Sequence, residues 1–92
     1  MAKIERVQTG VRIERRLLKV LKALAEYLDV SLGDLIEGIV LHNFEGELAF
    51  GDGTMKVIAD LKKVYGLKLS ATDAHKLEES SPPTRPGRGR KK

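Results

Sequence analysis

The sequence predicts a small, mainly α-helical protein with a single N-terminal β-strand, and three patterns in its 92 residues lead to that class. Apolar or β-branched residues alternate with polar or small ones over residues 7–13, which is the period of a half-buried strand. Apolar residues then recur at intervals of three and four, the period of amphipathic helices, over residues 14–28, 32–44 and 55–65. Residues 80–92 contain three prolines and no apolar residue, so we expect a disordered tail there.

The predicted strand has no partner elsewhere in the sequence. An isolated strand leaves its N–H and C=O groups without hydrogen bonds. We therefore expect it to pair with the same strand of a second copy, which makes a two-stranded ribbon across a homodimer. A short chain with 41% apolar residues and no cysteine has marginal stability as a monomer, and this also favours a dimer.

Two helices are expected directly after the strand. The first covers residues 14–28 and ends at Asp29, since an acidic residue can adopt the left-handed conformation that closes a helix. Ser31 then caps a second helix that runs to about Phe44. Its hydroxyl accepts from a backbone N–H in the first turn while Asp34 reaches back to the N–H of Ser31, as in a capping box.

The remainder of the chain predicts a loop, a third helix and a short fourth one. Three glycines mark residues 45–53 as a loop, and Asp52 or Thr54 caps the third helix, which stops at Gly66. Residues 70–73 read Ser-Ala-Thr-Asp, a second capping box, which predicts a short helix to about residue 79.

The order of strand, helix, short turn and Ser-capped helix extends over residues 5–44. The residues that define it are Val11-Arg12-Ile13 leading into Arg16-Leu17-Leu18, then Leu21, Leu24-Ala25-Glu26, Ser31 and Leu35-Ile36. This order resembles the ribbon-helix-helix family of dimeric transcriptional repressors, the MetJ/Arc type. The resemblance implies a dimerisation and DNA-binding domain at 1–44, a helical extension at 45–79 and a basic tail at 80–92.

The resemblance also implies which residues read DNA bases. The family inserts its ribbon into the major groove of double-stranded DNA, where each base pair shows a distinct pattern of donors and acceptors. The outward positions of the strand are Gln8, Gly10 and Arg12. Arg12 suits guanine and Gln8 suits adenine, whereas Gly10 has no side chain and makes the readout sparser.

Phosphate contacts are expected at three places. The resemblance implies a clamp at the start of the second helix, where the N–H groups of Ser31, Leu32 and Gly33 face an anion. Ser31 as a plain helix cap is the alternative. Lys3 and Arg6 flank the strand and either contact phosphates or keep the terminus in solution. Non-specific phosphate contacts are expected from the bases of the tail, which are Arg85, Arg88, Arg90, Lys91 and Lys92.

The distribution of charge favours a polyanionic partner. Residues 1–22 carry seven bases and two acids, residues 23–55 carry seven acids and no base, and residues 80–92 carry five bases and no acid. Basic ends around an acidic middle indicate one face for nucleic acid, and ordinary surface charge is the alternative. The bases of the first helix (Arg15, Arg16, Lys19 and Lys22) are expected mainly as a solvated face.

Other function classes find little support in the sequence. There is no cysteine, no apolar leader and no run of membrane-spanning length, so we expect a cytoplasmic protein without membrane contact. His42 and His75 have no second ligand at metal spacing, and no catalytic motif is present, so we expect neither a metal, a cofactor nor an enzyme.

We therefore expect a homodimeric transcriptional regulator that acts as a repressor. For the helical extension, packing on the dimer, docking of a partner protein and joining of dimers into a dimer of dimers on neighbouring half-sites are the alternatives. One alternative is an antitoxin that autoregulates its operon and binds a protein toxin through residues 45–79. Another is a dimeric architectural module with no sequence-specific role on DNA.

Overall fold

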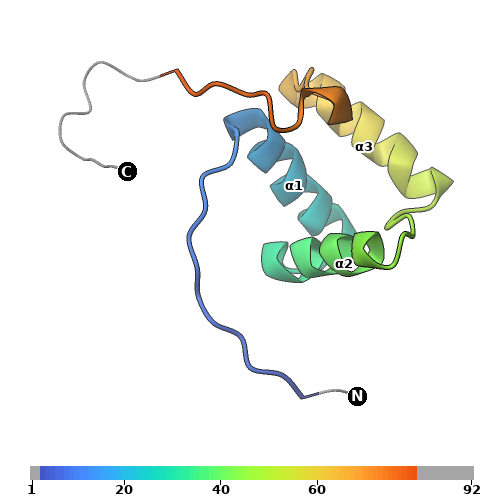
Figure 1. Cartoon of the computed structure of the whole chain (residues 1–92). Coiled ribbons are helices and arrows are strands. Elements are labelled where there is room, and N and C mark those ends of the chain that lie inside the picture. Colours follow the sequence, from blue (N-terminus) through green and yellow to red (C-terminus); the bar gives the residue numbers. More distant parts are fainter. Residues whose placement is uncertain (1–2, 81–92) are drawn as a thin grey trace.

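The computed structural model describes residues 3–80, and within that range it contains helices and no β-strand. The helices are α1 (Arg15–Leu28), α2 (Leu32–Phe44) and α3 (Asp52–Tyr65), followed by the single 3₁₀ turn η1 (Ala71–Asp73). Helices α1 and α3 lie side by side and run in opposite directions, while α2 crosses the end of α1 (Figure 1).

The predicted β-ribbon, and with it the ribbon-helix-helix fold, is wrong for this structure. Residues 3–14 form an extended segment, the N-terminal arm, that leads away from the helices (Figure 1). Val7 is 79% exposed and Val11 is 73% exposed, so the apolar side of the expected strand is not buried. Alternation specifies two faces of a strand but supplies no partner for its backbone, and no other segment of residues 3–80 forms a strand beside it. The mainly α-helical class is confirmed.

Helix α1 begins and ends on local interactions of its flanking residues. The carboxylate of Glu14 accepts the backbone N–H of Leu17 at 2.8 Å, and this hydrogen bond is the main reason that the pKa of Glu14 is lowered. Asp29 adopts the left-handed conformation, with φ 61° and ψ 44°, as the sequence predicts for the end of this helix. Its backbone N–H donates to the carbonyls of Ala25 and Glu26 and closes the last turn.

Helix α2 starts at the predicted cap. The Ser31 hydroxyl accepts the backbone N–H of Asp34 at 3.0 Å, which is the first of the two hydrogen bonds expected for the capping box. The helix ends after Phe44, and Gly46 then takes a positive φ of 73° that turns the chain toward α3. The three-residue connection at 29–31 therefore places the N-terminus of α2 at the C-terminus of α1.

Helix α3 differs from expectation at its start and agrees at its end. Gly51 occupies the N-cap and makes no side-chain hydrogen bond there, in place of the predicted Asp52 or Thr54. Gly66 ends the helix in the left-handed region at φ 69°. The capping box of Ser70 and Asp73 is formed, but it opens only the single turn η1.

The core is small and involves all three helices. Within residues 3–80 five residues are buried, namely Val20, Leu24, Ala25, Leu35 and Leu67. Half-buried side chains from the α2–α3 connection and from α3 pack on the central cluster, and they include Phe50, Val57, Ile58 and Leu61. Helix α3 is thus a structural layer against α1, which places its last turns next to the basic first turns of α1.

Candidate nucleic-acid interface

The N-terminal arm presents the predicted base-reading residues to solvent. Gln8, Gly10 and Arg12 are exposed, and so is Lys3 at the beginning of the described chain. A Cβ atom added at Gly10 would meet nothing within 4 Å, so no close packing in this chain requires glycine there. The arm can therefore present these side chains to a ligand without first leaving a packed environment.

Arg6 of the arm forms a forked ion pair with Glu37 of α2. Its Nε donates to Oε2 of Glu37 at 2.9 Å, and a terminal guanidinium nitrogen donates to Oε1 at 2.7 Å. The hydrogen bonding raises the pKa of Arg6 and lowers the pKa of Glu37. Two parallel N–H···O bonds are the geometry with which arginine also binds phosphate. The sequence pattern did not indicate this pair, because the two residues lie 31 positions apart.

Arg12 forms the second ion pair of the arm, with Glu79 in the segment that follows η1. That segment passes close to the start of α1, where the arm joins the helices (Figure 1). Both arginines of the arm are thus paired with carboxylates of the chain itself. Neither Glu37 nor Glu79 was recognised from the sequence as part of the site.

The N-terminus of α2 brings together the predicted phosphate-binding residues, but it also contains an acid. Ser31 and Gly33 are exposed and Leu32 is half-buried. The Ser31 hydroxyl is occupied by the backbone N–H of Asp34, whose carboxylate lies in the same first turn and helps to raise the pKa of Arg6. A phosphate at this helix end would therefore compete with a negative charge that already occupies the first turn.

A basic surface extends from α1 onto α3. The ammonium of Lys19 lies 6.0 Å from the centre of the Tyr65 ring, and Arg16 Nε would lie 4.0 Å from a Cβ atom added at Gly66. We define the basic surface as Arg15, Arg16, Lys19, Lys22, Lys62 and Lys63. Lys62 and Lys63 occupy the last turn of α3, where cations interact favourably with the helix dipole. The contacts of Lys19 with Tyr65 and of Arg16 with Gly66 depend on helix packing, so the sequence pattern did not join the end of α3 to this site.

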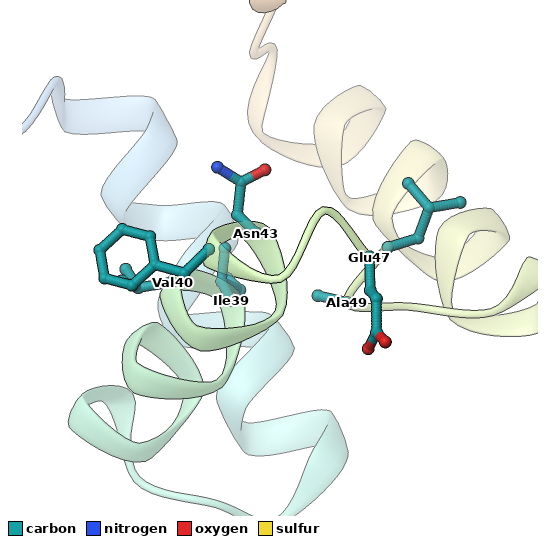
Figure 2. A pocket seen from close by; sticks show the side chains of 7 residues that line it. Ile39, Val40, Asn43, Glu47 and Ala49 are labelled. Atoms are coloured by element: carbon teal, nitrogen blue, oxygen red, sulfur yellow. The ribbon is translucent and has the colours of Figure 1, made fainter.

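An apolar groove lies at the end of α2. It has a volume of about 260 Å³ and is lined mainly by Ile39, Val40, Phe44 and Leu48. Figure 2 shows Ile39, Val40 and Asn43 on the last turns of α2, and Glu47 and Ala49 on the connection that follows. Phe44 is 77% exposed and Leu48 is 89% exposed, which is unusual for large apolar side chains placed so close together.

The remaining sequence assignments fall outside this interface or outside the described residues. His42 Nδ1 lies 2.7 Å from the carbonyl oxygen of Gly38 one turn earlier, and residues 3–80 contain no cluster of three potential metal ligands. The tail bases lie outside the described residues, and they are Arg85, Arg88, Arg90, Lys91 and Lys92.

Comparisons with protein-family models, curated proteins and solved structures found no match. No helix within residues 3–80 combines the length and the apolar character needed to span a lipid bilayer.

Proposed function

We propose that the protein is a homodimeric, sequence-specific DNA-binding regulator of transcription that represses by occupying operator DNA. The observation that carries this proposal is the exposed arm with Lys3, Arg6, Gln8 and Arg12, which leads directly into the basic first turns of α1. Exposed guanidinium and amide groups on an unpacked segment can follow a groove of DNA, while the basic surface beside it neutralises phosphates.

The side chains of the arm divide into two roles in this proposal. Arg12 donates two hydrogen bonds to O6 and N7 of guanine, and Gln8 pairs with N6 and N7 of adenine. Lys3 and Arg6 contact phosphates, whereas the charge of Asp34 weighs against a phosphate at the start of α2. This division predicts that specificity and affinity respond to different substitutions.

The small core and the apolar groove support a homodimer. Five buried residues form a limited core, whereas α2 leaves large apolar side chains exposed at its end. A second copy that covers the groove would bury Val40, Phe44 and Leu48 together with their equivalents across a two-fold axis. A two-fold dimer binds two-fold DNA, so the operator should be a near-palindrome.

The same groove favours a second candidate function, an antitoxin that autoregulates its operon. Leu48 and Ala49 belong to the segment 45–79 that would bind the toxin, and an apolar groove suits a partner protein. The two candidates differ in what covers the groove. A purified protein that remains monomeric, and that associates only with the product of a neighbouring gene, would favour the antitoxin.

Selection of binding sites from random DNA with the full chain tests the proposed function. We expect an enriched near-palindrome, and we expect Arg12→Ala to reduce discrimination at one base position by about 1–3 kcal/mol. Equal weakening on selected and random DNA would instead make Arg12 a phosphate contact. A folded dimer that enriches no sequence would contradict the specific regulator and leave the architectural module.

A further inference from the structure

We propose that Glu37 and Glu79 are internal competitors of DNA, which hold the two arginines of the arm until a phosphate replaces Glu37 on Arg6 and a base edge replaces Glu79 on Arg12. The inference depends on the proposed DNA binding and adds a control to it. In the free protein the arm is fastened at two points, at α2 through Arg6 and at the segment after η1 through Arg12.

The first argument is the geometry of the pair between Arg6 and Glu37. The carboxylate presents two oxygens to the guanidinium at 2.7 and 2.9 Å, much as a phosphate presents two of its oxygens. The same donor atoms cannot serve both acceptors at once. Binding of phosphate by Arg6 therefore requires that the bond to Glu37 opens.

The second argument is that neither pair contributes to the core. The side chains of Arg6 and Glu37 are 60% and 42% exposed, and those of Arg12 and Glu79 are 81% and 60% exposed. Exposed pairs of this kind contribute little to folding stability, so they can open while the helices stay intact. Such pairs can hold the arm against the helices in the free protein, and a polyanion can still displace the two carboxylates from the arginines.

The third argument is the placement of the two pairs along the arm. Arg6 and Arg12 lie on either side of Gln8 and Gly10, so the two glutamates restrain the whole base-reading stretch. Glu37 and Glu79 come from different parts of the fold, and each restrains one end of that stretch. DNA that binds both arginines compensates for the loss of both ion pairs. DNA that binds only one arginine leaves the other end of the stretch held by its glutamate.

The experiment compares two double variants that change the net charge equally. Glu37→Gln with Glu79→Gln removes both competitors, and Glu45→Gln with Glu78→Gln removes two exposed carboxylates near them. Binding to a fluorescent DNA duplex of random sequence is measured by anisotropy at one fixed salt concentration. We expect the first variant to bind more tightly than the control by roughly two- to fivefold for each pair removed.

Equal affinity of the two double variants would overturn the proposal, because the gain would then come from net charge alone. Failure of all proteins, including the wild type, to bind DNA would overturn the proposed function as well, so the two failures are distinguishable.

A second measurement follows the arm without DNA. The Nε–H proton of Arg6 is observed by NMR, and slow exchange with water is expected in the wild type and in the control. Its exchange should accelerate when Glu37 and Glu79 are replaced, and rapid exchange in all three proteins would overturn the proposal.

Discussion

Substitution of Phe44 by alanine should shift the proposed monomer–dimer equilibrium strongly toward the monomer. The ring is 77% exposed in a single chain, which corresponds to roughly 150 Å² of apolar surface for a phenylalanine. Complete burial of that area is worth about 4 kcal/mol at about 25 cal/mol/Å². Alanine retains part of the contact and burial is incomplete, so we expect a loss of about 2 kcal/mol for each copy.

A two-fold dimer loses this contribution twice, which amounts to about 4 kcal/mol and roughly a thousandfold in the dissociation constant. Sedimentation equilibrium over a range of protein concentrations measures that constant. Val64→Ala is the matched control, since Val64 is 71% exposed on α3 and does not line the groove. The reasoning is refuted if both variants dissociate alike, or if the wild type is already a monomer.

Three further substitutions or conditions test the fold and its ion pairs. Leu24→Ala should lower the free energy of unfolding in urea by about 2–5 kcal/mol because Leu24 is only 2% exposed, and a loss below that range would mean a loose core. Asp29→Gly should raise that free energy by about 1 kcal/mol, since Asp29 holds a φ of 61° that glycine adopts freely; a decrease would show that the side chain matters more than the backbone. The pKa of Glu37 is lowered in the folded chain, so its contribution to stability is present above its ordinary pKa of 4.5 and is lost as the pH falls through the lower folded value. The acid-induced loss of stability should therefore be only slightly smaller in Glu37→Gln, as expected of an exposed pair, and an NMR titration of Glu37 that shows no lowering of its pKa would contradict the pair with Arg6.

The parts of the fold that are determined by residues close together in the sequence could be predicted from it. Helices α1 and α2 lie where periodicity and capping place them, because Asp29 and Ser31 act within one turn of their own position. The strand did not follow, since its pattern describes the side chains while its backbone requires a partner from elsewhere. The cap of α3 was also mispredicted. Gly51 occupies the N-cap, although the neighbouring Asp52 and Thr54 have side chains better suited to capping.

The candidate site was likewise predictable only in part. The sequence indicated which arm residues have side chains suited to DNA, because that depends on residue type alone. It did not indicate Glu37, which meets Arg6 only after α2 folds back across α1. Nor did it join Tyr65 at the end of α3 to Lys19 of α1, although antiparallel packing of two adjacent amphipathic helices would have suggested that proximity.

The length of the arm has a consequence for how quickly the protein finds DNA. A fully extended segment of the length of residues 3–14 spans roughly 40 Å, so once the pairs of Arg6 and Arg12 have opened its cations can touch a duplex before the helices arrive. Segments that capture a partner at long range increase the rate of association, whereas well-fitted contacts of a folded body slow dissociation. We therefore expect substitutions in the arm to change mainly the rate of association with DNA. Substitutions on the basic surface should change mainly the rate of dissociation.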